Sequence, residues 1–188
     1  MISVIVPAYN AANYIEETLD SILNQTFQEF EVIVVDDGSS DATVDIVNRY
    51  IAQDNRIRLV QQQNGGSSNA RNTGIALAKY NWIAPVDSDD VLLPNRFEKQ
   101  LAAAARHPEV IGWGTYATRI TLESRPYSVQ ETGPATIEEF NEMRYKTGQI
   151  VVMPSSSMLL RKDIVQKVGG YSSATLEDLI LLDDMGAY

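Results

Sequence analysis

Four short apolar runs recur through the first half of the chain. They occupy residues 4–6, 31–35, 57–60 and 82–86. Each run is rich in β-branched residues and stays apolar instead of alternating with polar residues, which is typical of strands buried on both faces of a parallel sheet. The pattern therefore predicts four parallel β-strands.

Between these runs, apolar residues recur at helical spacing. Residues three or four positions apart share one face of a helix, so each stripe predicts an amphipathic helix packed on the sheet. A fourth helix is expected to begin near Pro94 and to end at residues 107–108, because proline is favoured in a first turn and stops a helix at its end. The three stripes are Ile15, Leu19, Ile22 and Leu23; Val44, Val47 and Ile51; and Ala70, Gly74, Leu77 and Ala78.

This alternation predicts an α/β fold with a doubly wound, mostly parallel sheet, in which ligands gather beyond the carboxyl ends of the strands. A chain of 188 residues is long enough for one domain. We expect residues 1–107 to form a Rossmann-like nucleotide-binding half and residues 108–188 a smaller second half. There the pattern weakens and predicts only a strand within 110–121, a flexible loop at 123–134, a short helix at 136–144 and a strand within 150–160.

Composition narrows the function classes. The chain has no cysteine, which excludes disulfides, zinc–thiolate sites and thiol nucleophiles and fits a reducing compartment. A net charge of −10 argues against a nucleic-acid partner, and an anionic ligand would need a cation or local donors to offset it. No apolar run approaches the roughly 20 residues that cross a bilayer, and Met1 leads directly into a strand. We expect a soluble, cytoplasmic protein. Location at the inner face of the membrane is the alternative.

Polar segments follow the predicted strands at the edge where ligands are expected. The first strand ends in Pro7-Ala8-Tyr9-Asn10 and the second continues into residues 36–41, and either segment alone could be an ordinary turn or helix cap. The fourth strand leads to Asp87-Ser88-Asp89-Asp90, whose three carboxylates repel one another unless they are solvated or bind a cation. Mg²⁺ and Mn²⁺ prefer such oxygen ligands, together with diphosphate oxygens. Taken alone, this segment fits a metal site and a solvated acidic turn equally.

In order and spacing, these segments and the intervening residues 64–66 and 70–72 resemble family 2 glycosyltransferases of the GT-A fold. The later Gly169-Gly170-Tyr171 and Glu177-Asp178 resemble that family's acceptor-side segment and catalytic acidic pair. The resemblance implies an inverting, metal-dependent enzyme that moves a sugar from a nucleotide sugar, expected to be a UDP-sugar, to a sugar or glycolipid acceptor. It also implies Mn²⁺ or Mg²⁺ as cofactor and a role in cell-surface polysaccharide or glycoconjugate synthesis, with peripheral association with membrane machinery as an option.

The resemblance further implies roles for individual residues on the donor side. Pro7 and Tyr9 would line the pocket of the nucleotide base. Asp37 would accept a hydrogen bond from uracil or a similar base, and Arg71 would approach the donor.

The resemblance also implies roles for residues of the two acidic segments, 87–90 and 177–178. Asp87 and Ser88 would contact the ribose or the diphosphate, and Asp89 would ligate the metal that bridges the two phosphates, whose charge grows as the nucleoside diphosphate departs. Asp178 is the candidate base for the acceptor hydroxyl, since a positioned carboxylate can take that proton. A surface acid at a helix start is the alternative for Asp178.

Two departures and three alternatives accompany this reading. The segment after Glu177-Asp178 is shorter than in the family, and the chain stops at Tyr188, so we expect a truncated enzyme. The first alternative is a non-catalytic nucleotide-sugar-binding module of the same fold. A signalling receiver domain ranks lower, because receivers carry an acidic pair after the first strand, whereas here a complete βα unit precedes Asp36-Asp37. A glycoside hydrolase would leave the nucleotide-type loops unexplained. His107 is expected at the surface, and Trp82 and Trp113 in or near the core.

Overall fold

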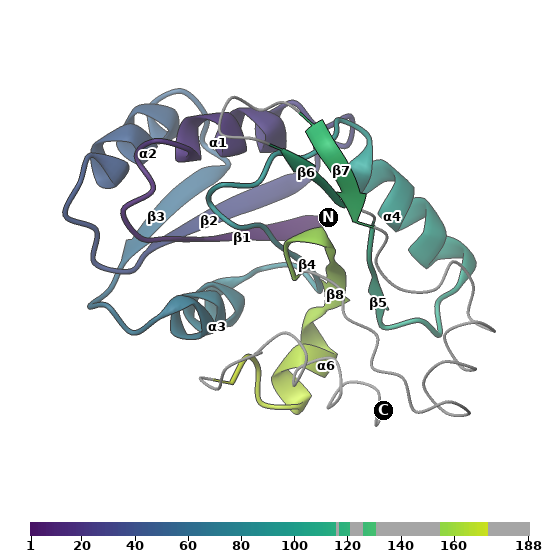
Figure 1. The fold of residues 1–188 in the computed structure, drawn as a ribbon. Helices are drawn as coiled ribbons and strands as arrows, with labels where there is room; N and C mark the ends of the chain where they lie inside the picture. Colours follow the sequence, from purple (N-terminus) through teal and green to yellow (C-terminus); the bar gives the residue numbers. More distant parts are fainter. Residues whose placement is uncertain (116, 121–125, 131–154, 173–188) are drawn as a thin grey trace.

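The computed structural model describes residues 1–115, 117–120, 126–130 and 155–172 (Figure 1). Their centre is a six-stranded sheet in the order β3-β2-β1-β4-β8-β5. The first four strands along the chain pair in parallel, which confirms the predicted parallel sheet. β8 runs antiparallel to both of its neighbours, so the sheet as a whole is mixed. The strands are β1 (Ile2–Ala8), β2 (Phe30–Asp36), β3 (Ile57–Gln61), β4 (Trp82–Pro85), β5 (Gly112–Trp113) and β8 (Leu159–Arg161).

The helices cover both faces of this sheet. Figure 1 shows α1, α2 and α4 on one face and α3 and α6 on the other. The chain moves from β1 to β3 in one direction and returns to β4 on the far side of β1. Since crossovers between parallel strands are right-handed, opposite directions place their helices on opposite faces. The helices are α1 (Ile15–Leu23), α2 (Thr43–Ile51), α3 (Ser67–Leu77), α4 (Arg96–Arg106) and α6 (Lys162–Lys167).

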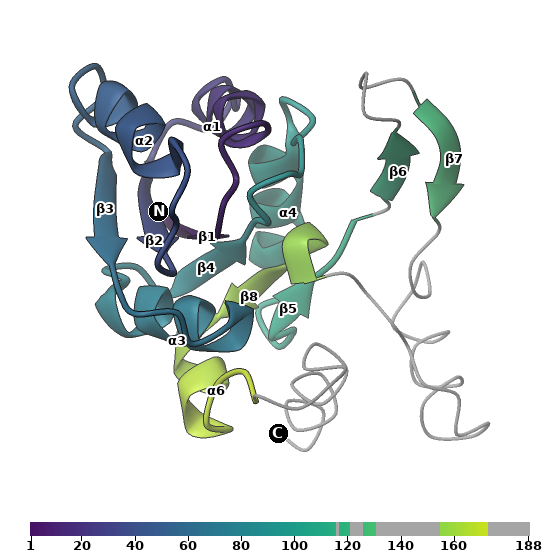
Figure 2. The same ribbon diagram turned by 60° about the vertical axis from the view of Figure 1, so that its left-hand side comes forward.

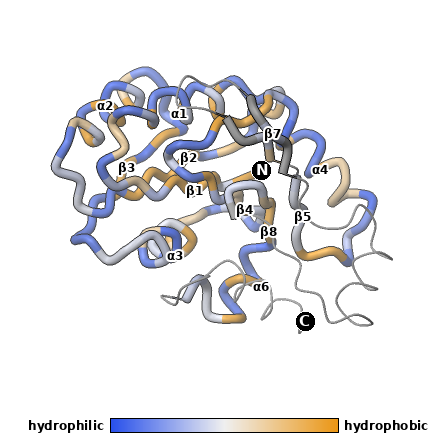
Figure 3. Tube along the Cα trace, viewed as in Figure 1, coloured by the Kyte–Doolittle hydropathy of each residue, from blue (hydrophilic) through white to orange (hydrophobic). Residues whose placement is uncertain are grey.

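Two hydrophobic clusters lie on the two faces. On β1, Val4 and Val6 pack toward α1, α2 and α4, whereas Ile5 packs toward α3 and α6. Successive side chains of a strand point to opposite faces, which is why an uninterrupted apolar run is needed where both faces are covered. Figure 3 shows the hydrophobic residues along the central strands and the hydrophilic ones toward the outer loops.

Helix α3 lies unusually close to the sheet at Gly74. A Cβ atom at this position would come within 2.4 Å of the Ile5 Cγ2 atom. Glycine therefore permits the contact that sets α3 against β1 and β2, and this contact helps to place the first turn of α3 at the carboxyl edge of the sheet. None of the helices in the described ranges has the length and apolar character needed to span a bilayer.

The predicted elements of the second half require correction. The expected strand 110–121 consists of β5 and the separate β6 (Ala117–Ile120), which belong to different sheets. The expected loop at 123–134 contains β7 (Pro126–Gln130), which pairs antiparallel with β6 and stands to one side of the main sheet (Figure 2). These strands are short, and pairing with neighbouring strands determines where each begins and ends. The apolar pattern along the sequence alone therefore could not distinguish β5 from β6 or detect β7.

Within its described part, the expected strand 150–160 is confirmed only at Leu159 and Leu160. Residues 155–157 form a 3₁₀ turn, η2 (Ser155–Ser157), and the strand begins only at Leu159. The helix expected at 136–144 lies outside the described residues. Helix α4 begins at Arg96, and Pro94 precedes it in a turn where its carbonyl accepts a hydrogen bond from the Thr26 N–H at 2.7 Å.

Candidate functional site

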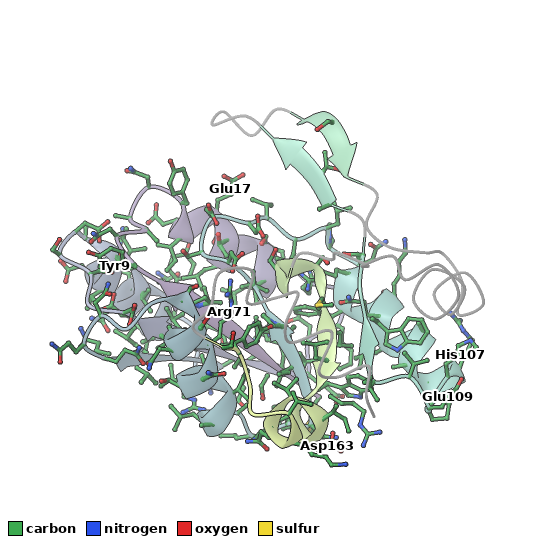
Figure 4. All side chains as sticks on the ribbon, turned by 60° about the horizontal axis from the view of Figure 1, so that its bottom comes forward. Tyr9, Glu17, Arg71, His107, Glu109 and Asp163 are labelled. Carbon is green, nitrogen blue, oxygen red and sulfur yellow. The ribbon has the colours of Figure 1, made fainter. Side chains whose placement is uncertain are left out.

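A cleft of about 490 Å³ opens at the carboxyl ends of β1, β2 and β4. It lies where the strand order reverses direction, between β1 and β4, which is the place where open α/β sheets bind ligands. Figure 4 places Arg71 near the middle of the molecule, with Tyr9 to one side and His107 at the opposite end. The structure brings six predicted site residues together in the lining: Pro7, Tyr9, Asp37, Arg71, Asp87 and Ser88.

The loops after β1 and β2 are fixed to each other by hydrogen bonds. The Asn10 N–H donates to Ser39 Oγ at 2.9 Å, and Asn10 Oδ1 accepts from the Ser40 N–H at 2.8 Å. The Ala12 N–H donates to Asp41 Oδ2 at 3.0 Å. Asn10 adopts a positive φ of 50°, a conformation that asparagine tolerates better than most residues. The rim of the cleft on this side is therefore built by two loops that act as one.

Tyr9 projects from this double loop and is 56 % exposed. An aromatic ring that is exposed on a well-anchored loop offers a flat apolar face on which a planar group can stack. Its position at the rim of the cleft is the geometry that a nucleobase would use.

Asp37 is buried directly after β2 and organises the next loop. Its Oδ1 accepts from the Gly65 N–H at 2.9 Å and from Gln62 Nε2 at 2.7 Å, and its Oδ2 accepts from the Gly66 N–H at 2.8 Å. A carboxylate has about four lone-pair sites, so one acceptor position is left for a ligand. Asp37 thus supports the turn that starts α3 and also lines the cleft.

The first turns of α3 supply positive charge to the cleft. Ser67, the first residue of α3, lines it, and the positive end of a helix dipole favours anions. Arg71 follows one turn later with its side chain only 7 % exposed and its Nη2 atom 2.7 Å from Asp87 Oδ1. Its guanidinium also lies 5.3 Å from the centroid of the Tyr171 ring. These contacts hold Arg71 in one place at the base of the cleft.

Opposite α3, the acidic segment 87–90 forms a tight turn that is anchored to α1. The Asp90 N–H donates to the Asp87 carbonyl at 3.1 Å. Thr18 Oγ1, which is on α1, donates to the Ser88 carbonyl at 3.0 Å. The main chain of the acidic segment is therefore set by helix α1 as well as by β4.

The three carboxylates of this segment occupy different environments. Asp87 is paired with Arg71. Asp90 accepts a hydrogen bond from the Ser156 side chain, and burial raises the pKa of Asp90, with the charges of Asp87 and Asp89 adding to that effect. Asp89 is exposed, and within the described part of the chain it has no hydrogen bond and no ion pair. Of the three, Asp89 is the most exposed, whereas Asp87 lines the cleft while paired with Arg71.

A buried polar pair on α4 was not foreseen from the sequence. Arg96 Nη2 donates to the Met158 carbonyl at 3.0 Å, and Gln100 Nε2 donates to the Ser157 carbonyl at 3.0 Å. Burial lowers the pKa of Arg96 to about 10, and the charge of Asp90 opposes this shift. The pair fixes residues 157 and 158, and the neighbouring Ser156 forms a hydrogen bond with Asp90 of the acidic segment. The sequence does contain a signal for this pair: Arg96 and Gln100 are four residues apart, so they share a helix face, and both lie on the buried side of α4 together with Phe97.

A divalent cation was predicted at Asp89. Among the described residues no group of three or more His, Cys, Asp or Glu side chains is arranged to hold a metal. Asp89 offers one exposed carboxylate beside the cleft, and Mg²⁺ or Mn²⁺ commonly takes one or two carboxylates and completes its shell with diphosphate oxygens and water. This donor set fits a cation that is shared with a bound diphosphate.

The remaining predicted residues fall into two groups. Glu177 and Asp178 lie outside the described residues. His107 is exposed, whereas Trp82 and Trp113 are partly buried and pack against the core, as expected.

Comparisons with known proteins bear on this geometry. A family model described as Glycosyl transferase family 2 matches residues 3–169. GlyG of Streptococcus pneumoniae serotype 4 is 46 % identical over 99 residues, which cover 52 % of this chain and 33 % of GlyG. A hyaluronan synthase of Pasteurella multocida is 41 % identical over 98 residues, which cover 52 % of this chain and 10 % of the synthase.

A solved structure extends the similarity over most of the fold. The crystal structure of S. aureus TarS 1-349 in complex with UDP-GlcNAc superposes with a TM-score of 0.74 at 25 % sequence identity, covering 98 % of this chain and 52 % of that one. The chain therefore spans about half of this structure and about a third of GlyG. Because the family match runs through every segment that lines the cleft, the chain belongs to glycosyl transferase family 2, and its sheet has the GT-A fold of that family.

Proposed function

We propose that the chain transfers a sugar from a nucleoside diphosphate sugar, specifically a UDP-sugar, to an acceptor hydroxyl with inversion at the sugar. One observation carries the proposal. The cleft places Arg71 and the N-terminus of α3 on one side and the acidic segment on the other, at the switch point of the sheet. Donors for phosphate oxygens thus face Asp87 and Ser88 across the cleft, and Asp89, which would ligate the cation, is the next residue along the chain.

The base would bind at the rim formed by the first two loops. Its ring would stack on Tyr9, and the remaining acceptor position of Asp37 would receive an N–H of the uracil edge. The similarity to TarS, which was crystallised with UDP-GlcNAc, supports a uridine nucleotide.

The diphosphate would lie between α3 and the acidic segment. Arg71 and the N–H groups of the first turn of α3 would bind its oxygens, with Asp87 and Ser88 at the ribose and phosphate. Asp89 would hold Mn²⁺ or Mg²⁺, which when bound neutralises the charge that develops on the departing nucleoside diphosphate. Because Arg71 is already fixed by Asp87, it needs little rearrangement to stabilise that charge.

The acceptor side supplies the base in this proposal. Asp178 would take the proton of the acceptor hydroxyl, with Glu177 as the next candidate. The relationship to a hyaluronan synthase supports a sugar or glycolipid acceptor in cell-surface polysaccharide or glycoconjugate synthesis.

Thermal unfolding with a ligand panel tests the donor site. UDP, CDP, GDP and several UDP-sugars are each added with Mn²⁺ or with a chelator. A ligand at 100 times its dissociation constant stabilises the folded state by about 2.7 kcal/mol, which shifts the melting temperature measurably. We expect a shift only when a uridine nucleotide and Mn²⁺ are present together. A shift of the same size in chelator would contradict the metal, and no shift with any nucleotide would contradict the donor site.

The alternative is a binding module that retains the nucleotide sugar without turning it over. Asp178→Asn separates the two functions, because loss of a general base lowers turnover by about 100- to 10,000-fold while leaving nucleotide affinity unchanged. Turnover is measured as release of UDP from the UDP-sugar that gives the largest metal-dependent shift. A wild-type chain that binds this UDP-sugar with Mn²⁺ but never releases UDP would favour the binding module.

A further inference from the structure

Asn72 on α3 holds a segment that lies 99 residues further along the chain. Its Nδ2 atom donates to the Tyr171 carbonyl at 2.8 Å, and its Oδ1 atom accepts from the Tyr171 N–H at 2.8 Å. One side-chain amide therefore satisfies both main-chain groups of one residue. Such a paired contact fixes the position and also the orientation of the backbone at Tyr171.

Two further contacts from the same helix support this attachment. Ser68 Oγ donates to the Ser172 carbonyl at 2.5 Å. The Arg71 guanidinium lies over the buried Tyr171 ring while its Nη2 atom contacts Asp87. The first half of α3 thus contacts the acidic segment of the donor cleft and residues 171–172 at the same time.

The glycine before Tyr171 shows how closely Asn72 approaches. A Cβ atom on Gly170 would lie 2.4 Å from Asn72 Oδ1, and Gly170 also has a φ of +78°. Gly169 has a comparable φ of +94°, but a Cβ atom there would meet no atom within 4 Å. Both positions favour glycine for conformational reasons, whereas only position 170 needs glycine because of Asn72.

We propose that Asn72 is a positioning residue for the transfer reaction: its paired hydrogen bonds to Tyr171 fix the point from which the chain continues toward Glu177-Asp178. This inference rests on the proposed function, in which Asp178 is the base. Six residues beyond Ser172 reach no further than about 20 Å even when fully extended, so the position of residues 171–172 limits where Asp178 can act. A shift of about 1 Å in a catalytic group can cost about 100-fold in rate.

The central variant is Asn72→Ala, with Asn48→Ala as its matched control. Asn48 is an exposed residue on α2, so the control makes the same change in a helix away from the cleft. Two functional measurements are compared: calorimetric affinity for UDP with Mn²⁺, and hydrolysis of a UDP-sugar with water in the place of the acceptor. We expect Asn72→Ala to lower the hydrolysis rate by about 10- to 100-fold while UDP affinity stays within about 3-fold, because the lost contacts act on the acceptor side. Asn48→Ala should change neither quantity.

Amide hydrogen exchange provides a readout that needs no nucleotide. The Tyr171 N–H donates to Asn72, so Asn72→Ala should accelerate its exchange, and Asn48→Ala should not. Asn72→Asp, which keeps the acceptor and loses the donor, should give a smaller effect on both exchange and hydrolysis if Asn72→Ala proves too unstable to purify.

The two glycines allow the contact itself to be tested. Gly170→Ala should lower hydrolysis more than Gly169→Ala, because only the former pushes against Asn72. In the double variant Asn72→Ala/Gly170→Ala, the added methyl group no longer meets the Asn72 side chain. The loss of hydrolysis in the double variant should therefore be smaller than the sum of the losses in the two single variants. Strictly additive effects would contradict a shared contact.

Three outcomes would overturn the role of Asn72. These are unchanged hydrolysis in Asn72→Ala, unchanged exchange at Tyr171 in Asn72→Ala, and loss of UDP affinity as large as the loss of hydrolysis, which would place Asn72 in the donor site. A wild-type chain that binds no UDP with Mn²⁺ would refute the proposed function itself. The two failures are therefore distinguishable from the wild-type binding measurement alone.

Discussion

Two buried carboxylates near the two ends of β2 hold the two ends of α3. Near the start of β2, Glu31 Oε1 accepts from the Lys79 N–H just after α3, at 2.7 Å. Directly after the end of β2, Asp37 accepts from the Gly65 and Gly66 N–H groups just before α3, at 2.9 and 2.8 Å. At the level of burial and hydrogen bonding the two sites are alike.

They differ in what surrounds them. Glu31 also accepts from Ser3 Oγ at 2.7 Å, and its Oε2 atom lies 3.6 Å from Arg58 and 3.7 Å from Lys79, so neighbouring cations compensate its charge. Asp37 lines the cleft, where the loops that follow four strands converge. A buried, hydrogen-bonded carboxylate is therefore no sign of a functional site by itself. The carboxyl edge of the sheet becomes a site because several strand ends meet there.

The largest expected effect on UDP binding is that of Asp89→Ala. Asp89 belongs to the carboxyl edge of the sheet, and the surroundings of Glu31 contain no proposed metal ligand. Asp89→Ala should weaken UDP binding in Mn²⁺ by at least about 100-fold, since loss of a metal ligand should exceed the 10- to 100-fold cost of losing a group that only supports one. Because Asp89 is exposed, the free energy of unfolding should stay unchanged. Calorimetry with Asp45→Ala, an exposed acid on α2, provides the control. Equal UDP affinity in Asp89→Ala and wild type would remove Asp89 from the metal site.

A smaller effect should separate the two carboxylates that hold α3. Asp37→Ala and Glu31→Ala should each lower the free energy of unfolding by about 1–3 kcal/mol, because each leaves buried N–H groups unsatisfied. Only Asp37→Ala should also weaken UDP binding and reduce the preference for UDP over CDP. Urea unfolding and calorimetry on the same two variants measure both quantities. If Glu31→Ala weakens UDP binding as strongly as Asp37→Ala, the contrast between the two ends of β2 is wrong.

The smallest effect concerns the loops that carry Tyr9. A hydrogen bond from the Thr43 side chain lowers the pKa of Asp41 below its ordinary value of 3.8. A lowered pKa means that the hydrogen bonds accepted by Asp41, from Thr43 near the same loop and from the Ala12 N–H of the other loop, add stability above that value and lose it as the pH falls through the folded pKa. Thr43→Val should raise the pKa of Asp41 back toward 3.8, as followed by NMR titration of its carboxyl carbon. An unchanged pKa would show that Thr43 does not set this contact.

The sequence predicted those features that follow from the order of elements. Tyr9 and Asp37 directly follow β1 and β2, and Asp87 lies two residues after β4. The carboxyl ends of parallel strands meet at one edge, so the convergence of these residues could be foreseen. The family resemblance then assigned Asp89 and Arg71 to the donor side.

Features that depend on partners distant in the sequence could not be foreseen. The separate environments of Asp87 and Asp90 depend on Arg71 and Ser156, and no local pattern pairs them. The attachment of Tyr171 to Asn72 joins two motifs that resemble the family separately. The strands β5 and β8 were misjudged for the same reason, since a short strand is specified by its neighbours more than by its own residues.

The most direct test of the central claim is crystallographic. Crystals of the chain are grown with UDP and Mn²⁺, and the anomalous difference density locates the manganese. We predict a peak in direct contact with the Asp89 carboxylate and the diphosphate, with the phosphates facing Arg71 and the first turn of α3 and the uracil against Tyr9. A manganese peak away from residues 87–90, or a diphosphate bound outside the cleft between α3 and this segment, would contradict the account.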